Sequence, residues 1–309
     1  MIDITLLGTS ALLPLPERAL TAAVLSCAGR SILFDCGEGT QTAARKARVS
    51  LMKTDVIALT HYHGDHVFGL PGLMQTMGSM GRAEKLILTG PAGLQAAMEP
   101  VLRLAEFLPF PVEMLELPKD GVFLSRLAPG WPDRAFLRPV PTQHRVASQG
   151  YEFSLSRAGR FLPEKAQALG VPVVQWRQLQ RGECVQVGEN TVFPSQVMEA
   201  ERTGLKFVFS GDTAPCAALE QAASGADLFI CEATYGEDEQ APLAAEYGHM
   251  TFSQAGRTAA RAQARRLWLA HFSQRIEDPE VYLPLAQAQF PLAECGRDGM
   301  RLSLHFLDE

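Results

Sequence analysis

The stretch LTHYHGDHVFGLPGL, residues 59–73, decides the fold class of this chain of 309 residues. It holds four potential metal ligands close together, which are His61, His63, Asp65 and His66. The apolar run at residues 56–60 just before them predicts a buried strand. In layered α/β proteins, functional side chains gather in the turns beyond the carboxyl ends of such strands. The stretch therefore predicts an α/β fold with a metal site at the edge of a sheet.

The ligand types in this stretch suit zinc, manganese or iron, because imidazole nitrogen and carboxylate oxygen bind all three. His61 and His63 can converge on one ion, while Asp65 and His66 turn toward another. Gly64 is expected to allow the tight bend between the two pairs. The alternative is a polar turn whose histidines face solvent. Four potential ligands in one short turn, in a chain with only 7 histidines, argue against that alternative.

Four more ionisable residues are expected in turns that follow predicted strands. They are His144 in RPVPTQH, Asp212 in FVFSGDT, His249 in EYGHMT and His271 in LWLAHFS. Each has a simpler explanation alone; Asp212, for example, could cap the following helix. Together they suggest that one face of a sandwich gathers most of the histidines. His305 lies inside the last predicted strand, and we assign it no function.

Apolar runs rich in β-branched and aromatic residues predict strands at residues 2–7, 31–35, 56–60, 85–89, 136–140, 151–155, 206–210, 227–231, 266–270 and 301–306. Helical patterns predict helices at residues 38–47, 91–104, 163–169, 215–223 and 251–262. The last helix should open with a Thr251/Gln254 capping box, and Pro91 and Pro215 are expected in first turns. Consecutive strands mixed with strand–helix alternation favour two sheets sandwiched between helices.

Composition sets further limits. The chain is 47% hydrophobic and 20% charged, which is ordinary for a soluble protein, and its net charge of -6 argues against a protein that coats nucleic acid. No apolar window reaches the roughly 20 residues of a membrane span, and the first residues lack the basic start of a secretion signal. We therefore expect a cytoplasmic protein without a membrane partner.

The cysteines and the breaker residues bear on the domain organisation. The 6 cysteines never form a C-x-x-C pair, so the sequence suggests neither a disulfide framework nor a thiolate zinc site. We expect one domain over residues 1–309. A short inserted substrate arm is predicted at about residues 157–197, where mixed charge accompanies several glycines and prolines.

Longer motifs carry a family resemblance. HYHGDH resembles the signature of the metallo-β-lactamase superfamily, and FDCGEGTQ, THYHGDHVFGLPGLMQTM, SGDTAPC, EATY and HFSQR are similar to ribonuclease Z, the tRNA 3′-processing endonuclease family. The similar motifs follow one another in the family's order. The resemblance implies an αββα four-layer sandwich, the metallo-β-lactamase fold. It also implies two divalent metal ions, with Zn2+ as the first choice and Mn2+ or Fe2+ as alternatives, and a homodimer.

The resemblance also assigns roles to residues. One ion goes to His61, His63 and His144, the second goes to Asp65, His66 and His271, and Asp212 bridges them. Asp65 would also act as the general base. His249 is left without a metal and would donate a proton to the departing ribose oxygen. Glu232 in CEATY is the candidate that keeps His249 charged. Its alternative roles are support of a metal-bound histidine and that of a structural acid at the end of a strand.

Two segments depart from the family pattern. The loop PLPERA, residues 14–19, keeps only Pro14 and Arg18 of the substrate loop, and Arg18 is expected either to contact a substrate phosphate or to be solvated. The arm lacks the Gly-Pro pair at its middle.

We therefore hypothesise a zinc-dependent endoribonuclease that cuts precursor tRNA. The alternatives are a ribonuclease Z-like phosphodiesterase acting on another nucleotide substrate, a thioester or lactone hydrolase on the same metal cradle, and a metal-stabilised nucleic-acid-binding module without catalysis.

Overall fold

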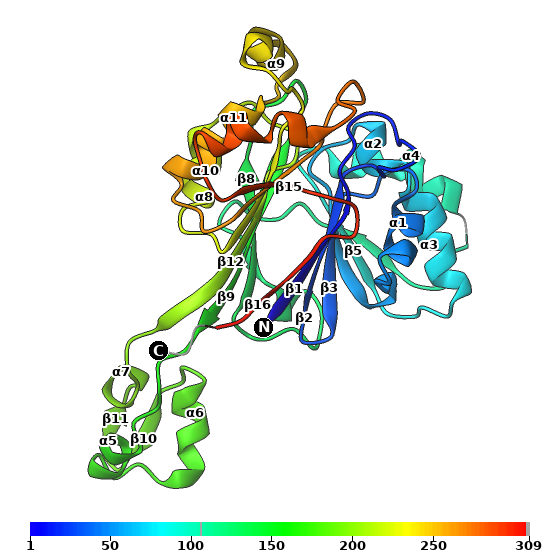
Figure 1. Ribbon diagram of the computed structural model, residues 1–309. Helices are drawn as coiled ribbons and strands as arrows, with labels where there is room; N and C mark the ends of the chain where they lie inside the picture. Colours follow the sequence, from blue (N-terminus) through cyan, green and yellow to red (C-terminus); the bar gives the residue numbers. More distant parts are fainter. Residues whose placement is uncertain (106, 307–309) are drawn as a thin grey trace. The chain divides into compact units, whose positions relative to one another are not determined.

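The computed structural model describes residues 1–105 and 107–306 of the chain (Figure 1). It divides into two compact units, and each is described by itself. Among the described residues, the first unit comprises residues 1–154 and 206–305, and the second comprises residues 155–205 and Phe306. No helix in the described part of the chain is both long and apolar enough to cross a membrane.

The first large sheet of the first unit carries the N-terminal half of the chain. In spatial order its strands are β16 (Arg301–Leu304), β1 (Ile2–Gly8), β2 (Ala22–Cys27), β3 (Arg30–Phe34), β4 (Thr54–Ala58), β5 (Leu86–Thr89) and β6 (Val112–Met114). Strands β16 to β3 pair antiparallel, and β3 to β6 pair parallel. Strand β4 is buried along its whole length, as expected for the strand before the histidine motif.

The second large sheet carries most of the C-terminal half. In spatial order its strands are β15 (Ala293–Cys295), β14 (Leu267–Ala270), β13 (Leu228–Glu232), β12 (Arg202–Phe209), β9 (Gln149–Arg157), β8 (Ala135–Pro141) and β7 (Val122–Phe123). Strands β12 to β15 run parallel to one another. The carboxyl ends of β12, β13 and β14 therefore meet at one edge of this sheet.

Helices cover the outer face of each sheet (Figure 1). Beside the first sheet lie α1 (Thr40–Lys46), α2 (Gly64–Val67), α3 (Leu70–Ser79) and α4 (Leu94–Leu102), and beside the second lie α8 (Ala217–Ala222), α10 (Phe252–Arg261) and α11 (Leu283–Gln287). Helix α9 (Ala241–Tyr247) lies apart from the sheets, at the top of the view. Single turns of 3-10 helix occur at Leu51–Lys53, Arg103–Ala105, Leu124–Arg126, Asp238–Gln240 and Pro279–Val281.

Apolar packing holds the four layers together. Helix α3 buries Leu70, Leu73, Met74 and Met77, which share one helical face, into the core behind the first sheet. Between the sheets, the Phe34 ring lies 5.4 Å from Phe207 and 5.5 Å from Phe209, centroid to centroid. Helix, sheet, sheet and helix thus follow one another, and the predicted αββα four-layer sandwich is confirmed.

Several local expectations need correction. Strand β2 and helix α3 were not predicted, because the sequence AAVLSC of β2 contains a single β-branched residue and α3 contains glycine and proline. Pro91 and Pro215 both precede their helices, because α4 begins at Leu94 after a left-handed Gly93 and α8 begins at Ala217. The capping box at Thr251 is confirmed: its Oγ1 accepts from the Gln254 amide at 3.3 Å.

The second unit is a small lobe with its own core. Its elements are α5 (Pro163–Ala168), the 3-10 turn Val173–Gln175, α6 (Trp176–Gln180), the hairpin of β10 (Val185–Val187) and β11 (Asn190–Val192), and α7 (Pro194–Val197). The Trp176 indole donates to the Val171 carbonyl at 3.0 Å. The core consists of Ala166, Val171, Leu179, Val185, Val192 and Val197. The arm expected at residues 157–197 falls within this unit.

Candidate metal centre

The histidine motif begins beyond the end of β4, where His61 is buried. His63 then precedes α2 in extended conformation, and Asp65 and His66 lie on this short helix rather than in a turn. Gly64 also differs from expectation. Its backbone is not left-handed, but a Cβ there would lie 2.3 Å from the Phe68 ring. Glycine at this position therefore permits close packing by Phe68 rather than a bend.

The downstream residues arrive from the second sheet. His144 follows β8, Asp212 follows β12, and His271 directly follows β14 with a left-handed φ of 59°. His249 was expected beyond a strand, and that expectation was wrong. It follows α9, after Gly248 at the C-cap of that helix.

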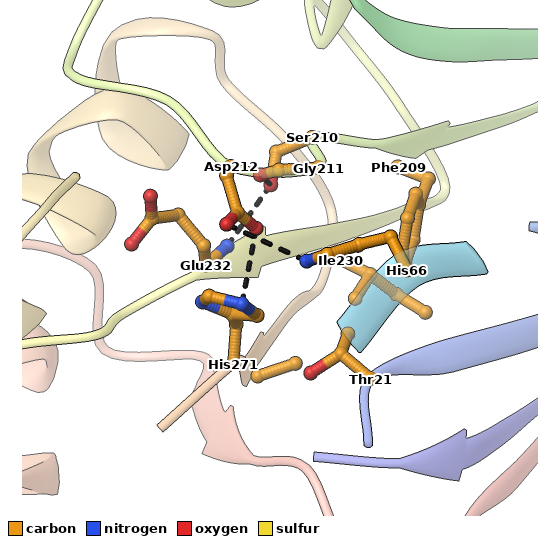
Figure 2. A pocket seen from close by; sticks show the side chains of 10 residues that line it. Thr21, His66, Phe209, Ser210, Gly211, Asp212, Ile230, Glu232 and His271 are labelled. Atoms are coloured by element: carbon orange, nitrogen blue, oxygen red, sulfur yellow. Dashed lines mark hydrogen bonds and ion pairs between the residues drawn. The ribbon is translucent and has the colours of Figure 1, made fainter. Parts of the chain in front are cut away.

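Potential ligand atoms form several overlapping groups, two of which share no residue and lie around Asp212. The atoms of each group lie within 4.8 Å of one another, and these two groups are His61, His63 and His144, and Asp65, His66 and His271. Asp212 Oδ1 is 3.2 Å from His271 Nε2, and its Oδ2 is 3.5 Å from His66 Nε2 and 3.7 Å from His61 Nε2. Figure 2 shows His66, Asp212 and His271 pointing toward one another. Asp212 thus lies between the two groups.

The centre suits a cation. Nε2 of His66 and Nε2 of His271 are both buried without a hydrogen-bond partner in the described part of the chain, and native proteins rarely leave such atoms unpaired. Burial would lower the pKa of His66, but Asp212 and Asp35 raise it well above its ordinary value. The carboxylates therefore favour positive charge here, and together with the imidazoles they form a donor set that fits divalent metal ions.

Hydrogen bonds at Nδ1 fix the orientation of three of these histidines. Asp35 Oδ2 lies 2.8 Å from His66 Nδ1, Thr234 Oγ1 lies 2.9 Å from His271 Nδ1, and the Gly248 carbonyl lies 2.9 Å from His144 Nδ1. Each contact occupies Nδ1 of its histidine and turns Nε2 toward the centre. Sequence reasoning missed Asp35, which was expected to end a strand. Its position in FDCGEGTQ, directly behind an apolar run, was the available signal.

The buried Glu232 and the half-buried His249 form a pair beside the two groups. Glu232 Oε1 lies 2.8 Å from His249 Nδ1, and Glu232 reaches His271 only through the Thr234 hydroxyl, which donates to Oε2 at 2.6 Å. Burial would lower the pKa of His249, but the charge and hydrogen bond of Glu232 outweigh it and raise the pKa to about 9. His249 is therefore an imidazolium at neutral pH in this arrangement.

The loop of residues 9–19 lies against the centre and is held at both ends. The Leu12 amide donates to Asp65 Oδ2 at 2.9 Å. Arg18 Nη2 donates to the Ile276 carbonyl at 2.5 Å, while Arg18 Nη1 is buried without a partner among the described residues. Asp298 accepts from the Ala19 amide at 2.6 Å. Sequence reasoning missed the Leu12 contact, because a backbone amide leaves no signal in residue type.

Known proteins resemble this chain along its whole length. Two family models match, "Anti-Pycsar protein Apyc1" over residues 2–103 and "Beta-lactamase superfamily domain" over residues 133–272. Ribonuclease Z of Lachnospira eligens is 40% identical over 309 residues, covering 100% of both chains. Ribonuclease Z of Clostridium tetani is 39% identical over 310 residues, covering 99% of each.

Solved structures agree with this match. The crystal structure of human tRNase Z, short form, has 27% sequence identity and a TM-score of 0.67, covering 98% of this chain and 100% of that one. The motifs around the metal centre and the identity to curated relatives thus lead to one conclusion, and the resemblance seen in the sequence is confirmed: this chain belongs to the ribonuclease Z family, with the metallo-β-lactamase fold.

Proposed function

We propose that this chain is a metal-dependent endoribonuclease that hydrolyses a phosphodiester at the 3′ end of precursor tRNA and leaves a 3′-hydroxyl. One observation carries the proposal: two groups of potential metal ligands meet at Asp212 in a chain that is 40% identical to a ribonuclease Z over its full length. A metal-dependent hydrolase needs such a cradle with positions left for water and substrate.

The metal assignment is part of the proposal. His61, His63 and His144 would hold one divalent ion, zinc in the first instance, and Asp65, His66 and His271 would hold a second, with Asp212 as a shared ligand. The unpartnered Nε2 atoms of His66 and His271 support this arrangement. When bound, two such ions activate a water molecule and stabilise negative charge on a phosphoryl oxygen.

Two residues carry out the two proton transfers of the proposed reaction, Asp65 as the general base and His249 as the general acid. Burial would raise the pKa of Asp65, but the His271 and His66 imidazoles, whose Nε2 atoms lie 3.8 Å and 3.4 Å from Asp65 Oδ2, hold it below its usual range, so Asp65 is an ionised carboxylate. We propose that Asp65 accepts the proton of the attacking water and that the hydrogen bond from the Leu12 amide keeps the Asp65 carboxylate in place. His249, oriented by Glu232, donates a proton to the departing ribose oxygen.

Arg18 remains a proposed substrate-binding residue. Because Nη1 is buried and Nη2 is bound to Ile276, a phosphate contact requires the guanidinium to turn away from that carbonyl. This geometry, together with the altered PLPERA loop, is the observation that favours the second candidate function, hydrolysis of a different nucleotide phosphodiester.

We also propose that the protein is a cytoplasmic homodimer, as family membership suggests. Sedimentation analysis of the purified chain should then give twice the chain mass of 33.7 kDa. A species of 33.7 kDa at micromolar concentration would contradict the dimer.

Cleavage assays test the main proposal. The zinc-loaded chain should cut precursor tRNA with a 3′ trailer, spare mature tRNA that ends in CCA, and lose both activity and metal in the Asp212→Ala variant. Bis(p-nitrophenyl) phosphate serves as a generic diester. Hydrolysis of this diester without cleavage of precursor tRNA would favour the second candidate, and hydrolysis of thioesters or lactones alone would refute both.

A further inference from the structure

One exposed cation lies at the edge of the candidate metal centre without an assigned role. Arg145 directly follows His144, and its guanidinium carbon lies 5.0 Å from the centre of the Tyr247 ring. Within the described residues no carboxylate pairs with Arg145, whereas Arg30 and Arg265 are paired with Asp55 and Asp227. Arg145 therefore has hydrogen-bond donors to offer a ligand.

The backbone fixes this arginine beside the reacting groups. The Gly248 carbonyl accepts from His144 Nδ1, which ties the loop of Arg145 to the end of α9, where Tyr247 lies. A Cβ on Gly248 would be 3.3 Å from the Arg145 amide nitrogen, so the two backbones touch. The His144 ring is 5.0 Å from the His249 ring. Arg145 and Tyr247 thus flank the side of the centre from which His249 would protonate the leaving group.

The charge around the centre makes a cation useful at this position. Asp35, Asp65, Asp212 and Glu232 lie in or beside the centre, and the whole chain has a net charge of -6. Bound metal ions would offset the carboxylates in the centre itself, but a polyanionic strand that continues beyond it still meets a chain of net negative charge, so an exposed guanidinium favours its approach. A guanidinium that rests on an aromatic ring keeps its N–H edges free for a phosphate and loses less conformational freedom on binding.

We propose that Arg145, supported by the Tyr247 ring, binds a backbone phosphate of the RNA strand next to the scissile bond. The inference rests on the proposed function and deepens it, because it names a substrate contact that sequence reasoning did not find. The contact is to phosphate, so it positions the strand without reading its sequence.

The test compares Arg145→Ala with the unaltered chain across a range of salt concentrations. For precursor tRNA, KM should rise about tenfold near physiological salt, and the slope of log affinity against log salt should become shallower by about 0.7 to 0.9, since one phosphate contact is lost. Hydrolysis of bis(p-nitrophenyl) phosphate, metal content and the unfolding temperature should stay unchanged. Arg145→Lys should retain the salt slope.

The matched control is Arg126→Ala. The Arg126 guanidinium lies 5.6 Å from the Phe123 ring centre, so this pair has the same chemistry away from the candidate ligands. It should leave KM and the salt slope unchanged. An unchanged slope in Arg145→Ala, or an equal loss toward the generic diester, would overturn the inference.

Binding of a short single-stranded RNA separates this inference from the proposed function. If the unaltered chain fails to cut precursor tRNA, the proposed function fails, but the salt slope for RNA binding still decides the role of Arg145. A shallower slope in Arg145→Ala supports the phosphate contact, and an identical slope refutes it.

Discussion

Asp35 and His66 form a buried hydrogen bond behind the metal centre, with Asp35 Oδ2 lying 2.8 Å from His66 Nδ1 and side-chain exposures of 0% and 1%. The same carboxylate also accepts from the Thr60 amide at 2.7 Å and the Thr60 hydroxyl at 2.8 Å. Asp35 therefore connects β3, the loop after β4 and the metal centre, and it orients His66 without facing the centre itself.

Asp35→Asn should weaken metal binding by about 10- to 100-fold, the usual effect of losing such a supporting carboxylate. The asparagine keeps the shape but loses the charge that strengthens the bond to His66. Competition with a chromophoric chelator measures the affinity. Asp120→Asn, on an exposed turn, is the control and should bind metal normally. Normal affinity in Asp35→Asn would show that His66 is oriented by its packing alone.

His249→Ala should retain both metals and lose most turnover, by about 10²- to 10⁴-fold, the range for removal of a general acid. Single-turnover cleavage of precursor tRNA, combined with metal analysis of the same sample, checks this. Because the His249 ring lies 5.0 Å from that of His144, loss of metal in the variant is the contrary result, and it would make His249 a ligand.

The Glu232–His249 pair should give the metal-free chain a pH-dependent stability. The pKa of His249 rises from 6.5 to about 9 in the folded chain, so the folded state binds this proton more tightly than the unfolded state. The stabilisation is therefore complete below pH 6.5 and is lost as the pH rises through about 9. It amounts to at most about 3 kcal/mol. Urea unfolding of chelator-treated protein at several pH values measures it.

His249→Gln is the comparison for this measurement, because glutamine keeps a polar side chain and cannot titrate. The difference in unfolding free energy between the unaltered chain and this variant should shrink between pH 6.5 and pH 9. A constant difference across that window would mean that the pair is not charged in the folded protein.

The ligand residues could be named from the sequence, for two different reasons. His61, His63, Asp65 and His66 form a compact motif behind an apolar run, and that local pattern alone predicts a metal site. His144, Asp212 and His271 are far away in the chain. Their places after predicted strands made them candidates, but only the family resemblance assigned them to the two ions. The structure brings all seven residues together because the strands that precede them end near one edge of the sandwich.

Contacts that depend on the backbone or on distant packing could not be predicted. The Leu12 amide donates to Asp65 because Leu12 has a left-handed φ of 62°. Leucine rarely adopts this conformation, so the sequence gives no sign of it. Asp35 was expected as an ordinary strand residue, but its left-handed φ of 57° places its carboxylate against His66 Nδ1. Arg145 contacts the ring of Tyr247, which lies about a hundred residues away in the chain. Helix α3 escaped prediction because tertiary burial of its apolar face outweighs its two internal glycines and its proline.

Gly248→Ala should disturb the metal centre through the backbone. Gly248 has a φ of 71°, where any other residue is strained, and a Cβ there would lie 2.9 Å from the His144 Cα and 3.0 Å from its Nδ1. His144 must therefore move, and we expect lower metal affinity and turnover in addition to a loss of stability. Gly225→Ala is the matched control, since Gly225 has a φ of 65° with nothing within 4 Å of the added atom. It should lose only about 1 kcal/mol of stability to backbone strain and bind metal normally. Thermal unfolding measures the stability of both variants, and metal titration measures their metal affinity. If Gly248→Ala bound metal as tightly as Gly225→Ala, the His144 loop would have to accommodate the added methyl group without disturbing the metal centre.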